Sequence, residues 1–192
     1  LMKEYIPLLA ESGKQFLVLG NMNHITFKEI FHYFRENKMW LGYNAGHFWF
    51  KVPDYYEAKN TDYKQDEDGQ KWRRLGNICW FTNMDIDIRH QFLDLYKHFS
   101  IQEYPEYDNY DAYFVKTVAE IPCDTDKPLA VPITFLSSFS PDQFELLDAN
   151  QFRKYDEVPV KSHGLIKDKD GTIKGKATYA RLLVRNRNPE KE

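Results

Sequence analysis

KWRRLGNICWFTNM, residues 71–84, is the stretch that decides the fold of this chain. It contains Leu75 and the run Ile-Cys-Trp-Phe at 78–81, an apolar segment long enough for a strand buried on both faces. Directly before that segment, residues 71–74 carry three cations and an indole. A buried strand needs no such cluster at its start, whereas a surface that holds phosphates and stacks on a base does. Two interpretations stay open: a core strand with a charged entrance, or an element that contacts nucleic acid.

The composition is that of a globular chain. It has 192 residues, of which 29% are charged and 42% apolar, enough for one domain or one and a half. The aromatic share of 16% serves a core and also supplies platforms for bases. The net charge of −3 does not suggest a nucleic-acid binder. It does not exclude one either, because binding follows local basic clusters.

The residues that bind metals show no recognisable spacing. Cys79 and Cys123 lie far apart and form no CxxC pair, so we predict neither a zinc site nor a disulfide framework. The six histidines show no ligand spacing and are interpreted as structural. The sequence has no signal peptide and no apolar run of membrane length, so we expect a cytoplasmic protein without a membrane partner.

The first part of the chain alternates helix and strand patterns. Residues 2–12 place apolar side chains at helical spacing, and 15–20 form a short apolar run. A second helical pattern with a capping box covers 26–37, and 39–43 predict another strand. This order is typical of a doubly wound α/β unit, in which 15–20 would be a central parallel strand.

The ends of these strands are the expected ligand edge. In doubly wound sheets, ligands bind beyond the carboxyl ends of the parallel strands. That rule places Asn21, Asn23 and Tyr43 at one edge. If residues 75–82 return antiparallel, the connection 43–74 overhangs the same edge. We expect its polar, acidic part, residues 57–70, to be a mobile loop.

The second part of the chain has weaker patterns. Residues 85–99 carry apolar side chains at helical spacing, which predicts a helix, and 167–171 are typical of a hairpin turn. Residues 179–185 predict a strand. On it we expect Arg181 and Arg185 to be exposed on one face, with Arg187 beyond. Two interpretations stay open: these arginines form a stripe that faces DNA, or they are charges that keep an edge strand from pairing with another strand.

Long strings across the chain resemble one family, the adenine-specific DNA methyltransferases of the EcoRI modification methylase type. They cover nearly the whole chain and are far longer than a four-residue signature. The strings are FLVLGNMNHITFKEIF (16–31), MWLGY (39–43), FKVPDYYE (50–57), KWRRLGNICWFTNMD (71–85), YPEYDNYDA (104–112), VPITFL (131–136) and GKATYARLLVR (175–185).

This resemblance implies an α/β fold and a methyl transfer reaction. The fold would be the C-terminal half of a Rossmann-like methyltransferase sheet over residues 1–96. A mixed α+β target-recognition, DNA-binding region would follow over 97–192. Such enzymes move a methyl group from S-adenosylmethionine to the exocyclic amine of an adenine that they flip out of duplex DNA.

The family's catalytic signature, Asn-Pro-Pro-Phe, is absent from the sequence. In the family pattern it falls immediately before the helix that matches residues 1–5, so it is expected before Leu1, and the glycine-rich cofactor loop lies further upstream. We therefore expect the chain to be the C-terminal part of such an enzyme, with no catalytic residue of its own. Alone, it is expected neither to methylate DNA nor to hold S-adenosylmethionine, and its partners would be duplex DNA and the missing N-terminal half.

The resemblance and the topology together suggest binding residues. Asn21 and Asn23 would shape the base pocket or contact the phosphodiester, although amides also close strand-to-helix turns. Arg73 and Arg74, with Lys71, would contact phosphates, and solvated surface arginines are the alternative.

Four further candidates complete this set. Trp72 would stack on a base or wedge into the duplex, but a tryptophan covering a sheet edge is the more common case. Tyr43 would lie at the base pocket. Arg181 and Arg185 would face the DNA.

Two functional hypotheses of different classes follow. One is a part of an S-adenosylmethionine-dependent, N6-adenine-specific DNA methyltransferase of a restriction-modification system. The other is a non-catalytic DNA-binding module derived from such an enzyme. A methyltransferase acting on RNA or a small molecule is disfavoured by the resemblance, not by the composition.

Overall fold

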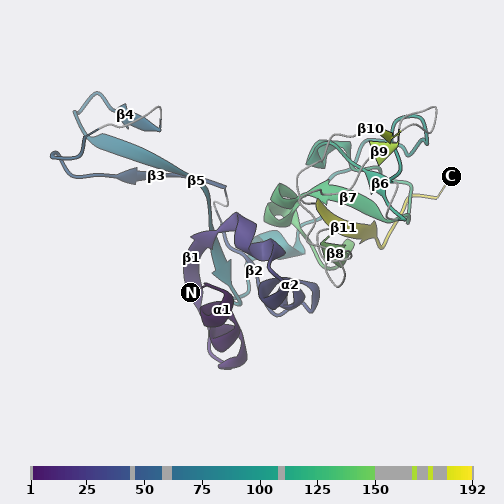
Figure 1. The fold of residues 1–192 in the computed structure, drawn as a ribbon, viewed down its shortest axis with the longest axis horizontal. Coiled ribbons are helices and arrows are strands. Elements are labelled where there is room, and N and C mark those ends of the chain that lie inside the picture. The colour runs from purple at the N-terminus through teal and green to yellow at the C-terminus, as the bar shows by residue number, and fades with distance from the viewer. Residues whose placement is uncertain are drawn as a thin grey trace.

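A computed structural model gives the architecture of most of the chain (Figure 1). Figure 1 shows a helix-covered sheet from which a long β arm projects, and a second sheet on the other side of the helices. The residues that the structure describes are 2–43, 46–57, 62–107, 111–149, 166–167, 173–174 and 181–191. Leu1, the residue before which the catalytic signature is expected, lies outside these described residues, and that expectation stays a prediction.

The N-terminal elements follow the predicted order. They are α1 (Met2–Glu11), β1 (Leu17–Asn21), the 3₁₀ helix η1 (Met22–Thr26), α2 (Lys28–Arg35) and β2 (Trp40–Leu41). The two α-helices pack against each other. They are also joined by the Tyr33 hydroxyl, which donates a hydrogen bond to Glu11 at 2.6 Å.

Strand β5 (Lys71–Thr82) organises the first, five-stranded sheet. Both β1 and β2 pair with its C-terminal end, so they lie on opposite edges of it. Both β3 (Gly46–Lys51) and β4 (Tyr63–Gln65) pair with its N-terminal end in the same way. One 12-residue strand therefore carries two small sheets in succession.

The expected central parallel strand at 15–20 is wrong. Strand β1 is antiparallel to β5, which is its only strand partner among the described residues. Leu17 and Leu19 are 52% and 39% exposed. The central position belongs to β5, because that strand pairs along both of its edges. The predicted antiparallel return of 75–82 is confirmed, so the carboxyl ends of β1 and β2 lie at one end of the sheet.

The connection 43–74 is largely an ordered ribbon rather than a loop. Strands β3 and β4 flank the first part of β5 and form the arm seen in Figure 1. The stretch 57–70, expected to be a mobile loop, contains β4 and a turn closed by the Gly69 amide, which donates to the Asp66 carbonyl. Residues 58–61 lie outside the described part.

Asn77 marks the junction between the arm and the rest of the sheet. Its φ of 56° is in the left-handed region, which asparagine tolerates better than most residues. The register with β3 shifts here, from Gly46 opposite Ile78 to residue 47 opposite Gly76. This bulge inserts one residue into β5 and reverses which side chains face which side.

The second sheet has four strands in the order β6-β7-β11-β8. Strand β6 is parallel to β7, and the other pairs are antiparallel. Strand β11 is therefore central, and its interpretation as a charged edge strand is wrong. The elements are β6 (Tyr113–Phe114), η3 (Val118–Glu120), β7 (Leu129–Pro132), η4 (Ile133–Ser138), β8 (Phe144–Ala149) and β11 (Arg181–Asn186).

A small hairpin lies between β8 and β11 in the chain. Strands β9 (Ile166–Lys167) and β10 (Ile173–Lys174) pair antiparallel, which agrees with the predicted hairpin. The turn residues 168–171 lie outside the described residues.

One hydrophobic core joins the two sheets. A single buried cluster contains Ile6, Phe34 and Phe81 from the first part together with Phe135 and Phe144 from the second. Helix α2 contacts strand β8 and so bridges the two. The division into 1–96 and 97–192 stays a prediction, and it would cross this shared core.

The helix expected at 85–99 is wrong. Only the short η2 (Asp87–His90) forms, and the chain then runs extended. Phe92 and Tyr96 are 56% and 78% exposed rather than buried on a helical stripe. The Gln143 amide holds this extended segment, because it accepts from the Leu93 amide at 2.6 Å and donates to the Leu93 carbonyl at 2.7 Å.

Within the described ranges, the longest helices are too short and too polar to cross a bilayer.

Candidate nucleic-acid interface

One face of the arm gathers tryptophans and cations. In an antiparallel pair, residues opposite each other share a face. Trp49 lies opposite Arg74, and both Lys51 and Lys64 lie opposite Trp72, one from each flanking strand. We call these five residues the basic–aromatic face.

The lysines of this face stack on its indoles. The Lys64 ammonium lies 4.6 Å from the centroid of Trp49 and 5.9 Å from that of Trp72, and Lys51 lies 5.4 Å from Trp72. Both lysines are exposed, and neither forms an ion pair with a carboxylate of the described ranges. Their charges are thus available to a phosphate while the indoles fix their positions.

Arg74 belongs to the same face but already has an anionic partner. Its Nε and Nη2 donate to one Asp62 oxygen at 3.0 and 2.7 Å, and its guanidinium lies 5.7 Å from the Trp49 ring centroid. The side chains of this pair are 40% and 35% exposed. An exposed ion pair of this kind contributes little to stability and leaves part of the guanidinium open to solvent.

The other two cations of the 71–74 cluster lie on the opposite face and brace the arm. The Arg73 guanidinium donates to the Tyr56 hydroxyl and lies 5.6 Å from the Tyr56 ring centroid. Lys71 donates to the backbone carbonyls of Asp54 and Tyr56. The alternation of a strand therefore splits the cluster predicted from the sequence into two faces with different environments.

Trp72 is fixed within the basic–aromatic face. Its indole N–H donates to Asp66 at 2.8 Å, and this hydrogen bond lowers the pKa of the Asp66 carboxyl. The ring thus holds one orientation between Lys51 and Lys64. A pre-positioned aromatic surface loses little rotamer entropy when it contacts a ligand.

The polar residues predicted at the sheet edge lie at the foot of the arm. Asn21 ends β1 and Tyr43 lies just after β2, at the same end of the sheet, where β5 enters it. The Asn21 side chain accepts a hydrogen bond from the Asn23 amide at 2.9 Å and caps η1. Asn23 is exposed, and Tyr43 is 50% exposed.

The expected exposed stripe of C-terminal arginines is wrong for Arg181. This side chain is only 9% exposed, because Phe114 covers it with its ring centroid 4.6 Å from the guanidinium. The guanidinium donates to the Val115 carbonyl at 3.1 Å, and burial lowers its pKa. Arg185 is exposed and pairs with Glu145 at 3.4 Å.

Sequence reasoning missed Lys51, Lys64 and Trp49 as members of one surface. The signal was the run of three aromatic residues at 48–50, a composition typical of strands. Trp49 and its neighbour Phe48 lie in β3, which pairs with β5 in the arm.

The first sheet also has an open apolar face. Helices α1 and α2 bury Phe81 on one side. On the other side, Leu17, Leu19 and Leu75 are 52%, 39% and 38% exposed, around a half-buried Trp80. We call these four residues the open sheet face. Contiguous exposed apolar side chains of this kind mark interaction surfaces.

Comparison with known proteins decides the family. Residues 1–187 match the family of the adenine-specific methyltransferase EcoRI. The chain belongs to this EcoRI methyltransferase family.

Curated relatives align with nearly the whole of this chain but are longer. The Type II methyltransferase M.EcoRI of Escherichia coli is 40% identical over 100% of the chain and 56% of its own length. The Type II methyltransferase M.MpnI of Mycoplasma pneumoniae is 35% identical over 97% of the chain and 61% of its own length. The chain thus spans little more than half of these relatives. No solved structure gives a significant match.

Proposed function

We propose that this chain is part of an S-adenosylmethionine-dependent, N6-adenine-specific DNA methyltransferase of a restriction-modification system, and that it supplies the grip on duplex DNA. The observation that carries the proposal is the basic–aromatic face, which projects on a ribbon from a chain of this family. Its two relatives above bear the name Type II methyltransferase, which supports the system.

The arm has the chemistry for duplex DNA. Lysines that neutralise phosphates release counterions, which favours binding. Lys51 and Lys64 would contact the phosphodiester, while Trp72 and Arg74 would lie against sugars or bases. Lys71 and Arg73, which brace the other face, would act mainly by keeping the arm straight.

The foot of the arm would receive the flipped base. Asn21, Asn23 and Tyr43 lie at the carboxyl ends of β1 and β2, the position at which open α/β sheets bind ligands. In this proposal, residues 1–96 form the C-terminal half of a Rossmann-like catalytic sheet, and 97–192 form the target-recognition region. Arg185, which is exposed, would contact DNA there.

In this proposal the described residues alone do not form a cradle for S-adenosylmethionine, which would supply the methyl group in the complete enzyme. At the end of β1, a Cβ on Gly20 would meet Phe81 and Met2 side-chain atoms at 2.7 and 2.8 Å, so this glycine is packed against protein. We propose that the remaining part of the enzyme brings the cradle. It would cover the open sheet face and the free edge of β1.

Two assays on the purified chain test the proposal. The chain should bind duplex DNA with an affinity that falls steeply with salt, because phosphate contacts release counterions. It should transfer no labelled methyl group from S-adenosylmethionine to an adenine-containing duplex. Absent or salt-independent DNA binding would contradict the proposal that this chain binds the duplex. Methyl transfer by the chain alone would contradict the proposal that it is only part of the methyltransferase.

A non-catalytic DNA-binding module is the second candidate. The observation that favours it is that the Asn-Pro-Pro-Phe signature is absent from the sequence while the basic–aromatic face is present. The reading frame upstream of Leu1 separates the two. An Asn-Pro-Pro-Phe motif and a glycine-rich loop there decide for the enzyme.

A further inference from the structure

Three distant segments of the chain meet beside the second sheet. The Cys123 amide donates to the Lys97 carbonyl at 2.8 Å, and the Phe99 amide donates to Asp124 Oδ1 at 2.7 Å. The C-terminal segment joins them, because the Glu190 amide donates to the Cys123 carbonyl at 2.9 Å. These backbone bonds fix the positions from which three ligand-type side chains project.

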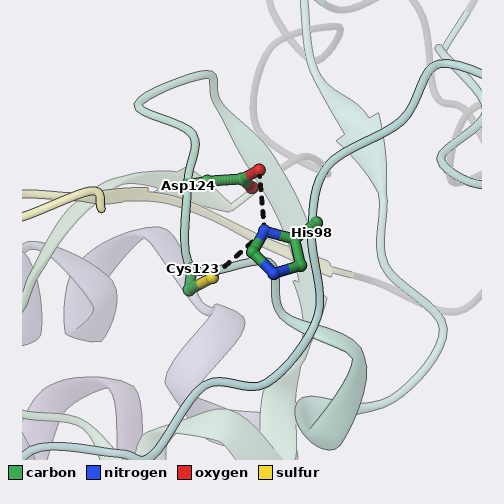
Figure 2. A group of neighbouring side chains, drawn as sticks. All are labelled: His98, Cys123 and Asp124. Carbon is green, nitrogen blue, oxygen red and sulfur yellow. Dashed lines mark hydrogen bonds and ion pairs between the residues drawn. The ribbon is translucent and has the colours of Figure 1, made fainter. Parts of the chain in front are cut away.

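Figure 2 shows the three side chains converging. The imidazole of His98 lies between the Cys123 thiol and the Asp124 carboxylate. His98 Nδ1 is 3.2 Å from Asp124 Oδ2 and 3.8 Å from Cys123 Sγ. All three ligand atoms lie within 4.8 Å of one another. Cys123 is buried and His98 is exposed, so the cluster is rooted in the protein and open to solvent on one side.

Both separations from the His98 nitrogen are close to those in a tetrahedral metal site. Zinc binds sulfur at about 2.3 Å, imidazole nitrogen at about 2.05 Å and carboxylate oxygen at about 2.1 Å. With tetrahedral angles, these lengths put nitrogen about 3.6 Å from sulfur and about 3.4 Å from oxygen. The observed separations of 3.8 and 3.2 Å differ from those values by about 0.2 Å.

Solvent can supply a fourth ligand. Cys123 lines a surface cavity of about 360 Å³, through which water can reach the cluster. A water can therefore complete a tetrahedron.

We propose that His98 Nδ1, Cys123 Sγ and Asp124 Oδ2, completed by a water, bind a zinc ion that ties the segment around His98 to the segment around Cys123. The donor set selects the metal. Magnesium and calcium take oxygen ligands, whereas one thiolate and one imidazole suit zinc. On binding, the sulfur–metal bond forms and the thiol proton leaves to solvent.

Asp124 is prepared for this role. Its Oδ1 stays engaged with the Phe99 amide, which orients Oδ2 as outer-shell partners orient metal ligands.

Cobalt titration of the reduced chain tests the site. Co²⁺ in a tetrahedral site with a thiolate gives an intense visible spectrum and a sulfur-to-cobalt charge-transfer band, and Zn²⁺ added afterwards should abolish both. The Cys123→Ser variant should lose the charge-transfer band. His98→Ala should weaken binding by more than the roughly 10–100-fold that outer-shell substitutions cost. His98 is 74% exposed, so its removal leaves the fold intact.

Two matched variants serve as controls. His90 forms a similar pair with Asp85, at 2.8 Å, but has no thiol beside it, and Cys79 is the other buried cysteine. His90→Ala and Cys79→Ala should titrate like the original chain. The absence of a charge-transfer band in the original chain, or a band that survives Cys123→Ser, would overturn the proposal. This outcome is independent of DNA binding.

Discussion

Replacing Lys51 and Lys64 together by alanine is expected to weaken binding to duplex DNA by roughly tenfold or more at moderate salt. Each phosphate contact contributes about 0.9 to the slope of log K against log salt concentration, so the double variant should flatten that slope by about 1.8. Both lysines are exposed, so the fold should be unchanged. Fluorescence anisotropy with a labelled duplex, over a series of salt concentrations, measures both quantities.

A matched control separates a local contact from a general charge effect. Lys14 and Lys28 are exposed and lie outside the arm, so alanine at both removes the same charge elsewhere. That variant should keep the original slope. Alanine at Arg73 and Arg74 should change it less than the lysine pair does, because those guanidinium groups have partners in Tyr56 and Asp62. Equal slopes for the arm and control lysine variants would remove the basic–aromatic face from the DNA interface.

Phe81→Ala is expected to lower the free energy of unfolding by about 3–5 kcal/mol. Its ring is fully buried, lies 6.0 Å edge-on from Phe34 and fills the space that a Cβ on Gly20 would need. It also lies where β5 joins the helices, so the loss should loosen the base of the arm. Urea unfolding followed by circular dichroism gives the difference.

Leu17→Ala is the informative comparison. Leu17 lies on the open sheet face and is 52% exposed, so its truncation in this chain should cost no more than about 0.5 kcal/mol. A loss as large as that of Phe81→Ala would mean that the open sheet face is already covered, and the proposed docking of further enzyme there would fail.

Local patterns predicted the first part of the fold well. The helical spacings of 2–12 and 26–37 and the apolar run 15–20 each formed the predicted type of element. The antiparallel return of 75–82 was also correct. These elements bury one face against nearby residues, so local periodicity determines them.

Other features depended on contacts distant in sequence. Residues 85–99 have helical spacing, but Gln143 holds Leu93 in an extended conformation. Arg181 is buried because Phe114 and the carbonyls at 115 and 116 lie over it, which no pattern within 179–185 reveals. A single-sequence pattern contains no information about such partners.

In the two candidate sites, too, the sequence reveals the local features but not the contacts between distant residues. Residues 71–74 were recognised as a basic cluster, but only the pairing with β3 and β4 shows that Trp72 and Arg74 share a face with Lys51 and Lys64. His98 and Cys123 are 25 residues apart and match no metal motif, because backbone bonds between separate segments bring them together.

Photocrosslinking from the arm tests the central claim, that the arm lies against duplex DNA, most directly. A photoreactive phenylalanine derivative would replace Trp49, a 38%-exposed aromatic residue of the basic–aromatic face, or Lys14 outside the arm. We expect a covalent adduct with duplex DNA from position 49 that unlabelled duplex competes away, and none from position 14. Adducts from position 14 but not from position 49 would contradict the central claim.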